Sequence, residues 1–372
     1  RALRDRERIS LGDVTLEILE TPGHSPESIS VAIYERAGDS VPYGVLTGDT
    51  LFIGDVGRPD LLSSLGSTPE ALANMLYDSL HDKLMTLPDA TRVFPGHGAG
   101  SACGKNLSTE LTSTIGDQRA ANHAVQPMSR EEFIQVVTEG QPWAPAYFVF
   151  DALRNREPHE LLHEHELPTA VTIAAALDQV RQGAVLLDTR DSRAFATGSL
   201  AGSVNVGLEG RYAQYVGSVV DPTEQIVLLA EPGTELEAKV RLGRVGYDSV
   251  IGYVENLHQV LQHHPELVRV GSRLTVGAFN ERRNTVTGLQ VIDVRDADEV
   301  AEGSMTGASN IPLPRLRDEM KNLDPTLPTV VFCAGGYRSS IAASLLRRAG
   351  FVDVSDLLGG YRAWEIARRK RL

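Results

Sequence analysis

The sequence predicts a multidomain α/β and α+β chain in which the part from about residue 160 onward contains parallel sheets. From about residue 160 onward, short apolar runs alternate with helical patterns, which is typical of strand–helix–strand units. The same region contains an internal repeat, and in the region before it three strand-like runs end in turns that carry His or Asp. At 372 residues, the chain is long enough for two or three domains with their own cores.

Three turns in the N-terminal part each place a metal-capable side chain just after a strand-like run. These side chains are His24, Asp49 and His97. A single loop histidine is usually solvated, but three such turns in this order resemble the third, fourth and fifth motifs of the metallo-β-lactamase fold. We therefore interpret residues 1–158 as a partial αββα sandwich with a helical extension, in which Ser129 and Glu132 predict a capped helix.

Residues 54–60 (GDVGRPD), which include Arg58, resemble the substrate loop of the persulfide dioxygenases. The resemblance implies one Fe(II) held by His24, Asp49 and a further His, with open positions for persulfide and O2. His97 would then support a ligand from outside the coordination sphere, or complete a second metal site, as in zinc-dependent relatives.

The first metal motif of that fold, His-x-His-x-Asp-His, should precede His24, yet residues 1–23 contain no His. We expect the N-terminal part of the domain to be absent from this sequence. On that expectation, the metal site is incomplete and the chain as written holds little or no iron.

Cys103 lies in a Gly/Ser-rich loop six residues after His97. It could approach the metal pocket and carry sulfane sulfur, or it could be a small packing residue. Residues 98–106 resemble the persulfide dioxygenases fused to rhodanese domains. The histidines at 159, 163 and 165 fall where one domain should give way to the next, and we interpret them as a solvated linker.

Cys333 follows an apolar run and opens a loop, residues 334–339 (AGGYRS), that leads into a helical pattern. Two glycines allow positive φ, so that backbone N–H groups and a helix N-terminus can face the thiol and favour a thiolate. A buried structural cysteine is the alternative. The Cys-x4-Arg-Ser spacing resembles the rhodanese active loop, whereas related phosphatases need one more residue. The resemblance implies a sulfurtransferase in which Cys333 is the nucleophile and Arg338 binds an anionic donor, and the other expected substrate-binding residues are Gly335, Gly336, Tyr337 and Ser339.

Further segments resemble the same family. Asp293 and Arg295 end a predicted strand, and we expect them to form a structural ion pair that supports the loop. Residues 303–312 resemble the "GHIxGAxNIP" turn, with Ser304 in place of its usual His, and residues 356–364 resemble the closing "LxGGxxxW" segment.

An upstream copy repeats this pattern at an offset of 105 residues, from Asp188 to Asp293, and later at 104, from Gly246 to Gly350. The second offset places Leu229 opposite Cys333, so this copy has no nucleophile. We expect an inactive rhodanese-like domain at 160–268 and an active one at 272–372.

The net charge of −13 argues against nucleic acids and anionic membranes as partners, and no apolar run approaches a membrane span. The resemblance implies a cytoplasmic homo-oligomer in which iron and O2 oxidise a small persulfide to sulfite, and Cys333 transfers sulfane sulfur to give thiosulfate. Two alternatives remain. One is a zinc-dependent thioester hydrolase of the glyoxalase II kind, and the other is a set of sulfur-sensing binding modules.

Overall fold

A computed structural model describes residues 2–61, 66–99, 101, 103–105, 107–141, 147–158 and 161–369. The chain divides into two compact units, Arg1–Ala144 and Pro145–Leu372. No helix in these described ranges is long and apolar enough to cross a membrane.

The first unit is built on a six-stranded sheet with the strand order β1-β2-β3-β4-β5-β6. Only β4 and β5 pair in parallel, and the other neighbours are antiparallel. The strands are β1 (Arg8–Leu11), β2 (Val14–Glu20), β3 (Ile29–Tyr34), β4 (Gly44–Gly48), β5 (Arg92–Pro95) and β6 (Ser113–Thr114). The described residues thus supply one sheet of the expected sandwich.

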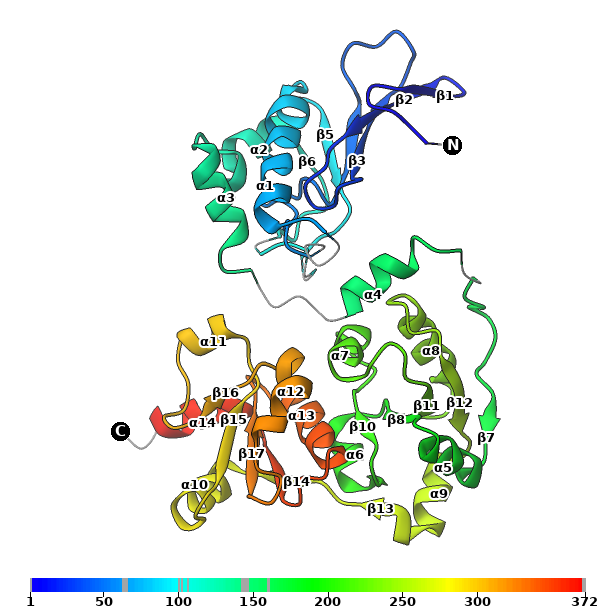
Figure 1. Cartoon of the computed structure of the whole chain (residues 1–372), viewed down its shortest axis with the longest axis vertical. Helices are drawn as coiled ribbons and strands as arrows, with labels where there is room; N and C mark the ends of the chain where they lie inside the picture. The colour runs from blue at the N-terminus through cyan, green and yellow to red at the C-terminus, as the bar shows by residue number, and fades with distance from the viewer. Residues whose placement is uncertain are drawn as a thin grey trace. The chain divides into compact units, whose positions relative to one another are not determined.

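The helices of the first unit are α1 (Pro69–Asp78), η2 (Ser79–Lys83), η3 (Leu84–Thr86), α2 (Ile115–Ala121), η4 (His123–Val125) and α3 (Arg130–Thr138). Figure 1 shows α1, α2 and α3 gathered on one side of β2 and β3. Helix α1 starts where the Thr68 side chain accepts a hydrogen bond from the Ala71 N–H, and it buries Leu72 and Leu76. The predicted capping box of Ser129 and Glu132 is present at the start of α3.

The second unit contains two five-stranded sheets in which every pairing is parallel. Their strand orders are β10-β8-β11-β12-β7 and β14-β18-β17-β15-β16, and β9 and β13 form a small antiparallel pair. The strands are β7 (Ala170–Val171), β8 (Val185–Asp188), β9 (Ser199–Leu200), β10 (Val204–Asn205), β11 (Ile226–Leu229), β12 (Val250–Val254), β13 (Val268–Arg269), β14 (Ser272–Leu274), β15 (Gln290–Asp293), β16 (Ser309–Asn310), β17 (Thr329–Phe332) and β18 (Val354–Leu357).

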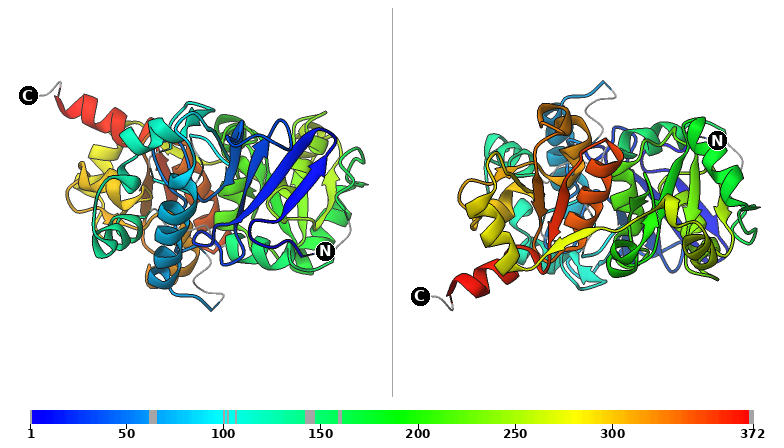
Figure 2. Two further views of the ribbon diagram at one scale, coloured as in Figure 1. Left: turned by 90° about the horizontal axis from the view of Figure 1, so that it is seen from above. Right: turned by 90° about the horizontal axis from the view of Figure 1, so that it is seen from below.

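The helices of the second unit are α4 (Tyr147–Arg154), α5 (Ile173–Arg181), α6 (Ser192–Thr197), α7 (Tyr212–Val219), α8 (Glu235–Gly243), α9 (Leu257–His263), η5 (Pro265–Leu267), α10 (Val276–Thr285), α11 (Ala297–Ala301), α12 (Leu313–Glu319), η6 (Met320–Asn322), α13 (Tyr337–Arg348) and α14 (Gly360–Arg369). Tyr147 of α4 belongs to the core of this unit. Helix α13 lies between the two sheets, as the views in Figures 1 and 2 agree.

Read from opposite ends, the two five-stranded sheets have the same strand order, with β8 in the place of β15 and β11 in the place of β17. One hydrophobic core joins both halves, for example through Val216 of α7 and Leu316 of α12. The predicted α/β and α+β class with parallel sheets is confirmed.

The strand register corrects one detail of the repeat. Leu229 pairs with Asp188 just as Phe332 pairs with Asp293, so Ala230 and not Leu229 occupies the position of Cys333. The offset is 332 − 229 = 103 at β11 and 354 − 250 = 104 at the following strand, so the stretch from β11 to β12 is one residue shorter than the stretch from β17 to β18. Ala230 has no nucleophilic atom, so the first copy still lacks the thiol.

Candidate functional site: a cysteine loop and a His–Asp–Cys group

Cys333 follows β17 directly and lies at the start of α13, with only 2% of its surface exposed. Its Sγ accepts a hydrogen bond from the backbone N–H of Gly336 at 3.1 Å and lies 3.6 Å from the Ser339 hydroxyl oxygen. A strand end therefore presents the thiol to the N-terminal turn of a helix, where N–H groups and the helix dipole stabilise negative charge.

The two loop glycines are not equivalent. Gly336 has φ +112 and caps α13, whereas Gly335 does not have a positive φ, and a Cβ added to it would meet nothing within 4 Å. Of the two glycines that allow positive φ, only Gly336 adopts it, and this one left-handed residue is enough to turn the Gly336 N–H towards the sulfur.

Tyr337 and Ser339 make side-chain hydrogen bonds that hold the loop in place. The Tyr337 hydroxyl donates to the carbonyl of Gly207, at 2.7 Å, in the first half of the unit. Ser339 is fully buried and its hydroxyl donates to the Gly336 carbonyl. Both residues therefore hold the shape of the loop.

Arg338 is already occupied by carboxylates. Its guanidinium donates to both oxygens of Glu299, at 2.6 and 2.8 Å, and to Asp296 at 3.1 Å. Burial disfavours its charge, but the hydrogen bonds and charge of Glu299 outweigh burial and raise the pKa of Arg338. An anionic donor must compete with Glu299 for this side chain, which the sequence prediction did not foresee. The only sequence signal was Asp-x-x-Glu, which forms a capping box on α11.

Asp293 and Arg295 form a buried ion pair at the end of β15. Arg295 donates to both carboxylate oxygens of Asp293, with side-chain contacts of 2.6 to 3.2 Å, and the Ser304 hydroxyl also donates to Asp293, at 2.7 Å. Ser304 thus keeps a donor at the position where the resemblance expects His. Asp188 and Arg190 repeat the pair in the first half.

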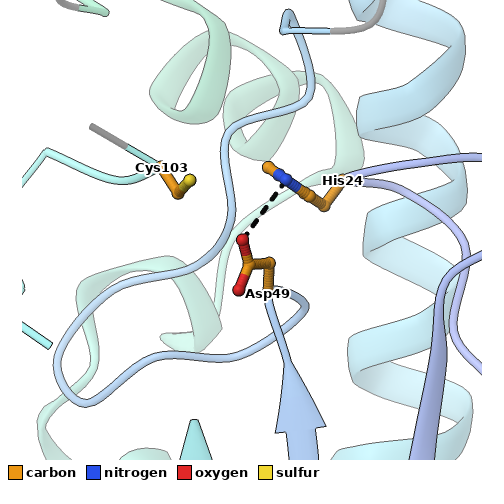
Figure 3. A group of neighbouring side chains, drawn as sticks. All are labelled: His24, Asp49 and Cys103. Carbon is orange, nitrogen blue, oxygen red and sulfur yellow. Dashed lines mark ion pairs between the residues drawn. The ribbon is translucent and has the colours of Figure 1, made fainter. Parts of the chain in front are cut away.

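In the first unit, the structure brings together the predicted ligands His24 and Asp49 and adds Cys103 to them. Their ligand atoms all lie within 4.8 Å of one another, and Figure 3 shows the His24 ring and the Cys103 sulfur facing the Asp49 carboxylate. His24 Nε2 is 3.4 Å from Asp49 Oδ2. A His nitrogen, a carboxylate oxygen and a thiol sulfur are all metal-binding atoms, so this group could hold a metal ion.

The local geometry orients His24 as a ligand. Its Nδ1 is 3.0 Å from the Arg58 carbonyl oxygen, so Nδ1–H donates there and Nε2 keeps its lone pair towards Asp49. Burial lowers the pKa of His24, which favours the neutral, metal-binding form. Glycines allow the close approach of the turns: a Cβ on Gly57 would lie 1.7 Å from the Asp49 carbonyl oxygen, and one on Gly96 would lie 2.5 Å from Asp49 Oδ1.

His97 contacts Asp49 from outside the group of three, with Nδ1 2.9 Å from Oδ1. Hydrogen bonds to Asp49, the larger cause, and to Cys103 raise the pKa of His97 to about 10. Burial acts to raise the pKa of Asp49, but the bond from His97 and the charge of His24 outweigh it and lower the pKa.

Arg58 is 1% exposed and its guanidinium pairs with Asp60, with two contacts of 2.7 Å. Its backbone N–H donates to the Cys103 carbonyl at 3.0 Å, which ties the predicted substrate loop to the loop of Cys103. Gly100, Ala102 and Asn106, part of the segment that suggested the fused subgroup, and His159 of the predicted linker lie outside the described residues.

The rhodanese-like domain family matches residues 276–367. A metallo-β-lactamase from Staphylococcus aureus of known structure superposes with a TM-score of 0.59 and is 30% identical, covering 68% of this chain and 70% of that one. Thiosulfate sulfurtransferase GlpE of Pseudomonas putida is 38% identical over 77 residues, which are 21% of this chain and 70% of that protein. Glyoxylase B2 of Dictyostelium discoideum is 30% identical over 136 residues, which are 36% of this chain and 41% of that protein.

The chain spans less than half the length of several curated relatives that it matches, between 36 and 48%. The fold likeness and the His24–Asp49–Cys103 group together imply a metal, iron or zinc. The matched domain contains Cys333 and its loop. The chain therefore belongs to the metallo-β-lactamase-fold proteins that carry a rhodanese-like domain.

Proposed function

We propose that the chain is a sulfurtransferase in which Cys333 carries sulfane sulfur. The Cys333 thiolate attacks the outer sulfur of thiosulfate or of a small persulfide. A new S–S bond forms on Cys333, the S–S bond of the donor breaks, and its electron pair leaves with sulfite or with the carrier thiol. An acceptor then attacks the outer sulfur and regenerates the thiolate.

The observation that supports this proposal most strongly is the hydrogen bond from the Gly336 N–H to the Cys333 Sγ. A structural cysteine has no need of a backbone donor at the head of a helix, whereas a thiolate and the terminal sulfur of a persulfide both gain from one. We assign the buried Asp293–Arg295 pair a structural role at the end of the neighbouring strand and no catalytic role. The corresponding loop after β11 has Ala230, so we assign the first copy, at 160–268, as a rhodanese-like domain without transfer activity.

For the first unit we propose oxidation of a small persulfide, RSSH + O2 + H2O → RSH + SO3²⁻ + 2H⁺. His24 and Asp49 would hold Fe(II), with Cys103 beside them, and the bound ion would supply the redox chemistry with O2. The Arg58 carbonyl keeps the His24 Nδ1 proton in place, and His97 holds a proton towards Asp49. Sulfite made in this way can take the outer sulfur of the Cys333 persulfide and leave as thiosulfate.

A zinc-dependent thioester hydrolase is the second candidate, favoured by the likeness to Glyoxylase B2. In that case His97 would help to hold a second ion, because it contacts the same carboxylate as His24.

The test of the sulfurtransferase proposal is the pair Cys333→Ser and Cys103→Ser, each of which removes one of the two free thiols. We expect Cys333→Ser to abolish thiosulfate:cyanide sulfurtransfer while its circular dichroism stays unchanged. Cys103→Ser should retain the activity. Transfer at the wild-type rate in Cys333→Ser would remove the assignment of the nucleophile.

A further inference from the structure

The second unit contains a pocket of about 980 Å³ in its first half, at the carboxyl ends of parallel strands. Thr189 and Arg190 follow β8, Gly207 and Leu208 follow β10, and Glu231 follows β11. In open α/β sheets, ligands bind at this edge. The pocket is therefore the first copy's own equivalent of an active site, and it persists although Ala230 supplies no nucleophile.

In this copy, the loop amide that would bind a donor sulfur is already hydrogen-bonded. The Gly233 N–H donates to a Glu235 carboxylate oxygen at 2.8 Å, whereas in the second copy the corresponding loop amide donates to Cys333 Sγ. The volume is also far larger than an inorganic sulfur anion needs, since pockets of about 300–1,000 Å³ take organic ligands. The pocket is suited to binding an organic molecule rather than to transferring sulfur.

Its unpaired charges are mostly positive. Arg193 and Arg211 are exposed, and among the described residues neither guanidinium makes a hydrogen bond or an ion pair. Glu209 also lines the pocket, and its carboxylate makes no hydrogen bond or ion pair with any residue that the structure describes.

The remaining charged groups of the lining are engaged. Glu231 pairs with His258 at 2.8 Å, and Glu237 pairs with Arg241 at 3.2 Å. Asp191 accepts hydrogen bonds from backbone N–H groups at the start of α6. Arg190 is buried with Asp188.

The pocket reaches the loop of Cys333 through Tyr337, which is one of its lining residues. The Tyr337 hydroxyl donates to the carbonyls of Gly207 and Glu209, and its ring lies 5.4 Å from that of Tyr215, which also lines the pocket. Burial is the main cause that raises the pKa of Tyr215, and the charges that act on it include Arg211 and Cys333. Tyr215 and Tyr337 thus join the lining of the pocket to the loop of Cys333.

We propose that this pocket binds the body of an acidic organic thiol, one with carboxylate or phosphate groups, whose sulfur exchanges sulfane sulfur with Cys333. Arg193 and Arg211 bind its acidic groups, and Leu208, Tyr215 and Tyr337 contact its apolar part. In the exchange, the carrier thiolate attacks the outer sulfur of the Cys333 persulfide. It leaves as a persulfide, and the electron pair of the broken S–S bond returns to Cys333. The inference rests on the proposed function of Cys333.

A binding measurement tests the pocket independently of that chemistry. Calorimetry on the 372-residue Cys333→Ser protein with glutathione, and separately with coenzyme A, should show saturable binding of at least one of them. Arg211→Ala and Arg193→Ala in that background should each weaken the binding roughly ten-fold, as expected for loss of a charge-assisted contact. Arg181→Ala, which removes an exposed arginine of α5 that does not line the pocket, is the matched control and should change nothing.

Single-turnover discharge of the Cys333 persulfide supplies the second test. After loading with thiosulfate, the thiol that binds should discharge the wild-type protein with a lower half-saturating concentration than 2-mercaptoethanol. Arg211→Ala should remove that advantage and leave discharge by cyanide unchanged. Absence of saturable binding of both thiols, or an equal effect of Arg211→Ala on all acceptors, overturns the inference. Failure of cyanide to discharge the wild-type protein would instead count against the proposed function of Cys333.

Discussion

Gly360 provides a sharp test of how closely the chain is packed around the carbonyl group of Cys333. It opens α14 with φ +58, and a Cβ at this position would lie 2.1 Å from the Cys333 carbonyl oxygen and 2.8 Å from the carbonyl carbon of Ala334. The same carbonyl oxygen accepts a hydrogen bond from the Tyr361 N–H at 2.7 Å. The Gly360→Ala variant therefore has to displace the backbone of the active loop.

The expected magnitude follows from two separate costs. A positive φ costs a non-glycine residue about 1–2 kcal/mol. Relief of the clash needs a shift of about 1 Å at Cys333, and displacements of that size at a reacting group can lower rates about 100-fold. Gly350→Ala separates the two costs, because Gly350 has φ +93 but open space around its Cβ.

The assay is kcat/KM for thiosulfate:cyanide transfer, together with the midpoint of thermal unfolding. We expect both variants to unfold at lower temperature, and only Gly360→Ala to lose activity, by about 100-fold. If Gly360→Ala were as active as Gly350→Ala, the loop would tolerate the displacement and the close packing at Cys333 would not matter for transfer.

Other residues yield four further predictions. Glu299→Gln should lower KM for thiosulfate and Arg338→Ala should raise it about ten-fold, because Glu299 competes with the donor for the guanidinium; steady-state kinetics with unchanged KM in both would mean that Arg338 does not contact the donor. Arg338 keeps the pKa of Glu299 below its ordinary value of 4.5 despite burial, so the stabilising Arg338–Glu299 ion pair is complete above about pH 4.5 and is lost as the pH falls through the lowered pKa. The unfolding midpoints of wild type and Glu299→Gln should therefore converge in acid. A difference between the two midpoints that stays constant with pH would refute this. Asp293→Ala should destabilise the protein by about 3–5 kcal/mol, because it leaves Arg295 buried without its carboxylate, whereas Asp298→Ala on exposed α11 should cost little; equal denaturant midpoints would contradict the structural role of the pair. In metal-loaded protein, His24→Ala and Asp49→Ala should remove the ion by elemental analysis while His97→Ala leaves it largely in place; loss of the ion in His97→Ala, with two zinc ions and thioester hydrolysis in the wild type, would favour the hydrolase.

Local patterns predicted much of the fold because their causes are local. The alternation of apolar runs and helical segments predicted parallel sheets, and both five-stranded sheets are parallel. The Ser129–Glu132 spacing predicted a capping box that is present. The register of the repeat was misplaced by one residue, because the offset of 104 between Gly246 and Gly350 was carried back to β11, where the strand pairing gives 332 − 229 = 103.

The site was predictable where a motif places a side chain at the end of a strand, as for Cys333, His24 and Asp49. Partners contributed by distant segments were not. The carboxylates that bind Arg338 precede it by about 40 residues. For Cys103, the sequence left open whether it approaches the metal pocket or only packs its loop, and the structure places it beside His24 and Asp49. The pocket of the first copy had no sequence signal, because its lining comes from three separate strand ends and from Tyr337 of the other copy.

The most direct test of the central claim is the mass of the protein after incubation with thiosulfate. We expect the 372-residue chain to gain one sulfur atom, peptide mapping to place it on Cys333, and cyanide to remove it. A chain that gains no sulfur, or gains it equally in Cys333→Ser, would contradict the assignment of Cys333 as the carrier of sulfane sulfur.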